Sequence, residues 1–106
     1  MNLPKKDFKI KIAPFTFDVK YVDELKTPAG TKANGHIHMI KQEIRLAKDL
    51  TKERTEATLL HEVLHGLIHN TGLRPKFKEN LTEEELVRRL GFALYGFIED
   101  NKELFK

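Results

Sequence analysis

The chain has 106 residues, no cysteine and a formal net charge of +3 at pH 7, with 40% hydrophobic and 33% charged residues. This length predicts a single domain, residues 1–106, with one hydrophobic core. The lack of cysteine excludes a disulfide framework and a zinc site built from thiolates. Lysine and arginine are spread along the chain rather than clustered, so the charge gives little support for a nucleic-acid partner.

The sequence shows no segment that would direct the protein into or across a membrane. No apolar run approaches the roughly 20 residues that a membrane-spanning helix needs. Residues 1–6 include two lysines, but no long apolar stretch follows them, so we expect no signal peptide. We therefore expect a cytoplasmic protein without a membrane partner.

Alternation of apolar and polar side chains predicts β-strands in the first half of the chain. The expected strands cover residues 8–12, 15–20 (with 21–22 as an extension or a turn), 35–40 and 43–47. Ile44 and Leu46 would face inward, whereas His36 and His38 share a face that we expect to be solvated. Residues 23–34 contain proline and glycine, which are typical of a loop. The last two strands would form a hairpin.

Helical patterns follow in the second half. We expect a first helix over about residues 51–71, because Asp49 or Thr51 can cap its free backbone N–H groups. Gly72 supplies a left-handed stop, and Pro75 prevents the helix from continuing.

A second helix is expected over about residues 82–102, after a polar loop at 76–80. Thr82 and Glu85 form a capping box, in which the N-cap threonine is followed three residues later by a glutamate. The apolar stripe of this helix consists of Leu86, Val87, Leu90, Leu94, Phe97 and Ile98. Strands within about residues 8–47, followed by two helices, predict an α+β fold. We expect a small, mostly antiparallel sheet of three to four strands with both helices packed on one face.

The first expected helix carries the motif His61-Glu62-x-x-His65. Residues four apart lie on one face of an α-helix, so the two imidazoles can bind one metal ion. Glu62 projects to the side of this pair, where it can take a proton from a metal-bound water without being a ligand. Both histidines lie at the edge of an apolar cluster that would pack on the core. This cluster consists of Leu60, Leu64, Leu67 and Ile68, bordered by Ala57 and Val63.

A catalytic zinc ion usually has three protein ligands, so the motif needs one more. His69 is near in sequence but lies about 12 Å along the helix axis from His61, too far to share one ion easily. The glutamates that open the second helix are better placed. Glu85 is used by the capping box, Glu83 points into the centre of the apolar stripe, and Glu84 lies on its flank. From the residues alone, two readings stay open: Glu84 is a ligand, or all three acids only complement the helix N-terminus.

The order of strands, hairpin, HExxH helix and acidic helix resembles small phage- and prophage-type metallopeptidases, which are relatives of the ImmA/IrrE-like group and of minimal zincins. The resemblance covers about residues 35–101. It rests on Gly35-His36-Ile37, Ile44-Arg45-Leu46, residues 58–66, Glu84-Glu85-Leu86-Val87, Leu90, Leu94-Tyr95 and Asp100-Asn101. The resemblance implies a zincin-like arrangement in which His61, His65 and Glu84 bind one zinc ion and Glu62 is the general base.

We therefore expect a zinc metallopeptidase that hydrolyses a peptide bond in a protein or peptide substrate, in the phage or mobile-element context that the resemblance implies. The strand at residues 43–47 would pair with an extended substrate through an exposed edge. The alternative is a non-catalytic, zinc-stabilised regulatory or protein-binding module. A fourth ligand such as His69 or His38 would favour this alternative, because structural zinc sites are normally closed by four ligands.

Overall fold

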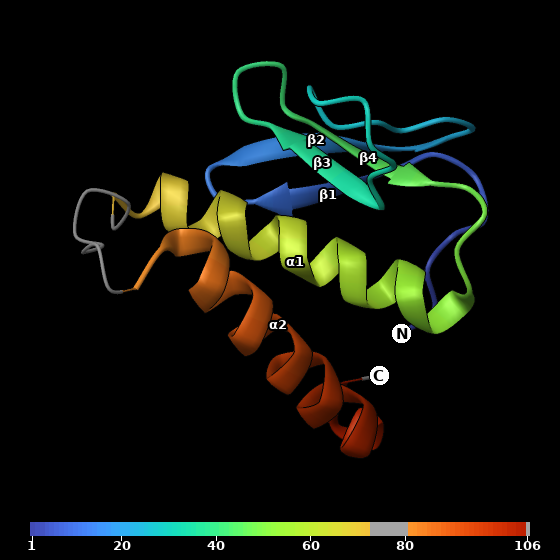
Figure 1. The fold of residues 1–106 in the computed structure, drawn as a ribbon. Helices are drawn as coiled ribbons and strands as arrows, with labels where there is room; N and C mark the ends of the chain where they lie inside the picture. Colours follow the sequence, from blue (N-terminus) through green and yellow to red (C-terminus); the bar gives the residue numbers. More distant parts are fainter. Residues whose placement is uncertain (73–80, 106) are drawn as a thin grey trace.

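The computed structural model describes residues 1–72 and 81–105 (Figure 1). The elements are β1 (Phe8–Ile12), β2 (Phe15–Val22), β3 (Gly35–His38), β4 (Glu43–Ala47), α1 (Lys52–Asn70), α2 (Glu83–Asp100) and the 3-10 helix η2 (Lys102–Phe105). They confirm the α+β class and lie close to the predicted ranges, although the third strand ends two residues early. The predicted loop at 76–80 and the stop at Pro75 lie outside the described residues. None of the helices in the described ranges is long and apolar enough to cross a membrane.

The strands form one mixed sheet in the order β1-β2-β4-β3. β1 and β2 pair antiparallel, with Phe8 opposite Val19, and β3 and β4 pair antiparallel, with Ile37 opposite Ile44. The central pair, β2 and β4, is parallel, with Val19 opposite Ile44. The prediction of a mostly antiparallel sheet is therefore wrong at this pair, and the sheet is mixed.

The hairpin of β3 and β4 docks on β2 through β4. Ile44 and Leu46 of β4 are fully buried. An interior position in the sheet removes their apolar surface from water, which stabilises the fold. β3 is short and contains a glycine and two histidines, which suits an edge strand. The loop at 23–34 carries the chain across to that edge. The prediction that the strand at 43–47 offers an exposed edge to a substrate is therefore wrong, and β3 holds this position instead.

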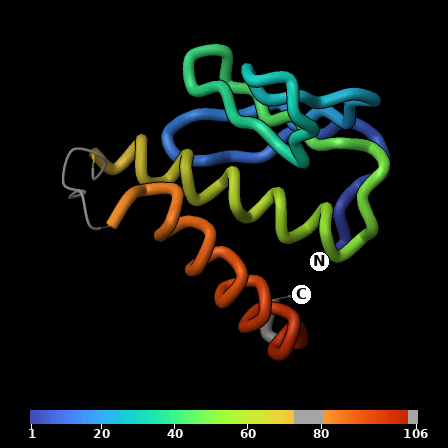
Figure 2. Tube along the Cα trace, in the orientation of Figure 1, coloured from blue at the N-terminus to red at the C-terminus, as the bar shows by residue number. Residues whose placement is uncertain are grey.

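The helices form two further layers rather than a pair on the sheet (Figures 1 and 2). α1 contacts β1, β3 and β4, and α2 contacts α1 on its far side. The expectation that both helices pack on one face of the sheet thus holds for α1 alone. Among the described residues, α2 packs mainly against α1, so only a narrow stripe of it is covered. Val87 and Gly91 are buried, whereas Leu90 and Phe97 of the predicted apolar stripe are 47% and 55% exposed.

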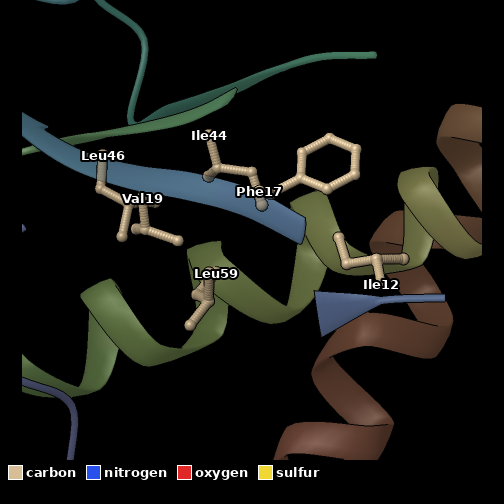
Figure 3. Packing of buried hydrophobic residues seen from close by; sticks show 6 residues of the cluster. All are labelled: Ile12, Phe17, Val19, Ile44, Leu46 and Leu59. Carbon is tan, nitrogen blue, oxygen red and sulfur yellow. The ribbon is translucent and has the colours of Figure 1, made fainter. Parts of the chain in front are cut away.

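The hydrophobic core lies between the sheet and α1 (Figure 3). Strand side chains alternate between the two faces, so every second residue reaches this layer. Leu59 is the buried residue that α1 contributes to the cluster. The buried cluster consists of Ile12, Phe17, Val19, Ile44, Leu46 and Leu59.

α1 is covered by the sheet on one side and by α2 on another, and its apolar residues are oriented differently from the prediction. Leu59 and Glu62 are buried, and Leu64 lies against Gly91 of α2. Of the predicted core-facing cluster at residues 60, 64, 67 and 68, only Ile68 is buried, and Leu67 is 41% exposed. The predicted stripe is therefore not the sheet-facing side, because α2 covers part of it.

Both helix starts agree with the predicted caps. The Oγ1 atom of Thr51 accepts a hydrogen bond from the backbone N–H of Arg54 at 3.1 Å. Thr82 Oγ1 accepts one from the backbone N–H of Glu85, also at 3.1 Å. Beyond the end of α1, Gly72 has a φ of 74°, the left-handed conformation that terminates a helix. These local signals place the histidines of α1 and the glutamates of α2 at defined positions along their helices.

Candidate metal centre

His61, His65 and Glu84 meet where the first turn of α2 lies beside α1. His61 Nε2 is 3.0 Å from Glu84 Oε1, and His65 Nε2 is 2.9 Å from Glu84 Oε2. Each residue offers one ligand atom, and these atoms lie within 4.8 Å of one another. The structure thus brings together the three residues that the sequence suggested as metal ligands. Their role in binding an ion stays a prediction.

Helix geometry, the cap of α2 and a further contact between the helices account for this meeting. His61 and His65 are one turn apart on α1, and their ring centroids are 5.0 Å apart. The cap at Thr82 puts Glu84 in the first turn of α2. Three turns further along α2, the Tyr95 hydroxyl donates a hydrogen bond to buried Glu56 of α1 at 2.6 Å. This second contact sets the direction in which α2 crosses α1.

Glu83 contacts the other ring nitrogen of His65, a contact that the sequence reasoning missed. Glu83 Oε2 is 2.6 Å from His65 Nδ1, and both side chains are largely buried. A carboxylate on the second nitrogen fixes the tautomer and orientation of a metal-binding histidine. The signal was present in the sequence, because a glutamate in the centre of an apolar stripe needs a polar partner on the neighbouring helix.

Glu62 is buried beside the two histidines, with 8% of its surface exposed. The close approach of β3 produces this burial. A Cβ atom on Gly35 would lie 3.2 Å from Oε2 of Glu62 and 2.5 Å from Cγ2 of Thr58, so only glycine allows the strand to come this near. Burial raises the pKa of the Glu62 carboxyl from 4.5 to about 7. The group can therefore gain or lose a proton near neutral pH.

The protonation of His61 also suits a ligand. Burial lowers the pKa of this imidazole below its usual value of 6.5, although the neighbouring Glu84 carboxylate acts in the opposite direction. A histidine must be neutral to coordinate a metal. The desolvated position of His61 therefore favours the form that binds.

A cavity of about 400 Å³ opens at the cluster, with walls from α1, β3 and the start of α2. His69 and His36 line this cavity, but both are exposed and neither belongs to the cluster. His38 accepts a hydrogen bond at Nδ1 from the backbone N–H of Lys41, at 3.1 Å. Glu85 is also outside the cluster. Of the alternatives for the third ligand, only Glu84 contacts both motif histidines.

The residues present fit a zinc ion. Two histidines and one glutamate form one of the ligand sets of catalytic zinc sites, which use three protein ligands. The carboxylate of Glu84 and the largely desolvated imidazoles supply the oxygen and nitrogen donors that zinc takes. Glu83 adds the outer hydrogen bond that such histidines usually make.

Comparisons of the chain with protein-family models, with curated protein sequences and with solved structures find no match. The interpretation of the cluster therefore rests on its own residues and geometry. The resemblance to small metallopeptidases stays a prediction.

Proposed function

We propose that this protein is a zinc-dependent peptidase whose metal ligands are His61, His65 and Glu84. The observation that carries the proposal is the position of one carboxylate. The two oxygens of Glu84 lie 3.0 Å and 2.9 Å from the Nε2 atoms of the two motif histidines. This arrangement supports a single ion shared by α1 and α2.

Glu62 would carry out the proton transfers of the reaction. When bound, zinc acts as a Lewis acid toward a peptide carbonyl and lowers the pKa of a coordinated water to about 7. The Glu62 carboxylate, with a pKa of about 7, would accept the proton of the attacking water. It would then deliver this proton to the nitrogen of the leaving amine. Its burial between α1 and Gly35 holds the carboxylate in one position.

An extended substrate would approach along β3. This strand lies at the edge of the sheet, and Gly35, His36 and Ile37 line the same cavity as the cluster. An edge strand offers backbone N–H and C=O groups that a peptide can pair with. The edge strand next to the cluster therefore supports a peptide, rather than a compact small molecule, as the substrate.

The test combines metal analysis with hydrolysis of a random peptide library by purified protein. We expect about one zinc per chain in the wild type and in Glu62→Gln. His61→Ala should lose most of the zinc. The wild type should cleave library peptides, and Glu62→Gln purified in the same way should not, which also controls for contaminating proteases.

Four results would count against the proposal. Wild-type protein without zinc, or unchanged zinc uptake by His61→Ala, would show that the cluster is not the metal site. Zinc bound at the cluster without cleavage of any library peptide would instead favour a structural ion in a binding module. Equal cleavage by wild type and Glu62→Gln would mean that the cleavage does not depend on Glu62 and comes from a contaminating protease or another base.

A further inference from the structure

A second hollow adjoins the metal centre on the side away from Glu83. It has a volume of about 260 Å³, and it shares Gly35, His61 and Glu62 with the cavity at the cluster. We call this second hollow the arginine pocket. The residues that it adds to the shared lining include Arg54, Arg88 and Phe92. A molecule lying across His61 and Glu62 would therefore extend into this pocket.

Helix spacing explains why the two arginines flank the metal centre. Arg88 lies one turn after Glu84 on α2, and Arg54 lies about two turns before His61 on α1. α1 and α2 run in roughly opposite directions, so a step forward on one helix matches a step backward on the other (Figure 2). Phe92 follows Arg88 by one further turn. The arginine pocket is thus built by the same two helix faces that carry the cluster.

Neither arginine forms an ion pair with an acid among the described residues. In residues 1–72 and 81–105, the ion pairs within 4 Å leave Arg54 and Arg88 without a carboxylate partner, whereas Arg45 pairs with Glu43. The acid lining the pocket is Glu62, which is buried, and the nearby Glu84 carboxylate is directed at the histidines. Two arginines that form no ion pair within the described part of the chain therefore line the pocket.

The pocket also contains an exposed aromatic ring. Phe92 is 57% exposed, although it sits among charged side chains. A planar guanidinium binds a carboxylate through two parallel hydrogen bonds. The ring would contact the apolar part of the same ligand. This combination matches a peptide residue that carries a carboxylate on a short carbon chain.

We propose that the arginine pocket is a substrate subsite that binds a peptide carboxylate next to the scissile bond, through Arg54 and Arg88. This inference rests on the proposed peptidase function. The carboxylate has two sources, the side chain of Asp or Glu and the C-terminus of the peptide. The first makes the enzyme selective for acidic sequences, and the second makes it remove residues from chain ends.

Binding to the zinc-loaded Glu62→Gln protein tests the subsite without hydrolysis. Four labelled peptides differ only in Glu or Gln at one position and in a free or amidated C-terminus. Fluorescence anisotropy should give about tenfold tighter binding for one of the two carboxylates than for its neutral counterpart, as expected for a charge-assisted pair. Arg54→Gln and Arg88→Gln should each remove most of this preference. Arg89→Gln is the matched control, because Arg89 is an exposed neighbour that does not line the pocket.

The outcomes separate this inference from the proposed function. Binding that differs by less than about twofold between charged and neutral peptides, or an equal loss in Arg89→Gln, overturns the subsite, even if zinc and peptide cleavage are found. A carboxylate preference that depends on Arg54 and Arg88 supports the subsite, even if the wild type cleaves none of the library peptides. Melting curves of the three arginine variants exclude unfolding as the cause of any loss.

Discussion

Glu83 holds the side of the His65 ring that faces away from the proposed metal, with Oε2 2.6 Å from Nδ1. The next residue, Glu84, contacts the opposite nitrogen, Nε2, at 2.9 Å. Two consecutive glutamates in the first turn of α2 thus have different geometric roles on one imidazole. Glu84 shares its carboxylate with His61, whereas Glu83 contacts His65 alone among the cluster histidines.

This contact predicts that Glu83→Gln weakens zinc binding without removing a ligand. Loss of an outer carboxylate typically lowers metal affinity about 10- to 100-fold. Glu84→Gln should weaken binding more, because it replaces a ligand. Zinc affinity measured by competition with a chromophoric chelator checks both changes. Glu85→Gln is the control, since Glu85 lies outside the cluster, and it should stay within about threefold of wild type. An unchanged affinity in Glu83→Gln would show that the contact has no part in metal binding.

The burial of Glu62 predicts a pH-dependent destabilisation of the metal-free protein. Its pKa is raised from 4.5 to about 7, so the folded state binds more protons than the unfolded state between these values. The free energy of unfolding therefore falls as the pH rises from about 4.5 to 7. Glu62→Gln has no such carboxyl group. With chelator present, it should be more stable than wild type at pH 8 by about 3 kcal/mol.

Urea unfolding of both proteins at pH 4.5 and pH 8 measures this difference. Titrating groups far from Glu62 contribute equally to wild type and variant, so their effects cancel in the comparison, whereas the charges of His65 and Glu84 act on Glu62 itself. The same pH dependence in both proteins would mean that the Glu62 carboxylate is solvated in solution.

The contact between β3 and α1 predicts that Gly35→Ala destabilises the fold. The added Cβ would lie 2.5 Å from Cγ2 of Thr58, which forces one of the two elements to shift. Overpacking of this kind costs about 1–3 kcal/mol. Thr58→Ala in the same chain removes the clashing methyl group and should restore part of the loss. Thermal unfolding of the single and double variants measures the coupling.

Gly96→Ala is the matched control for this substitution. Gly96 lies inside α2, and a Cβ atom there meets nothing within 4 Å. Alanine in a helix interior should therefore stabilise the protein by up to about 1 kcal/mol. If Gly35→Ala is tolerated as well as Gly96→Ala, β3 does not pack closely on α1 in solution.

The hydrogen bond from Tyr95 to Glu56 predicts a role in docking α2 rather than in catalysis. Glu56 is 1% exposed, so loss of the hydroxyl would leave its Oε1 without this donor. Tyr95→Phe should lower the free energy of unfolding by about 1–3 kcal/mol. A double-mutant cycle with Glu56→Gln isolates the pair energy. A coupling near zero would contradict a structural bond, and a loss of peptide cleavage at unchanged stability would point to a different role for Tyr95.

Local rules account for most of what the sequence by itself determined. Alternation predicted the strands, and the Thr51 and Thr82 caps predicted where the helices begin, because each signal acts over a few neighbouring residues. The spacing of His61 and His65 is local in the same way. One turn of helix brings the two rings together whatever the rest of the chain does.

Only the tertiary structure decided which segments meet. Ile44 and Leu46 could be recognised as buried, but insertion of β4 between β2 and β3 depends on how much apolar surface each arrangement covers. The same holds for α1, whose exposed and buried sides depend on α2. The contacts of Glu84 with both histidines, of Glu83 with His65, and of β3 with Glu62 join residues at least 18 positions apart. Such contacts arise from packing between elements, for which helix and strand periodicity carry no information.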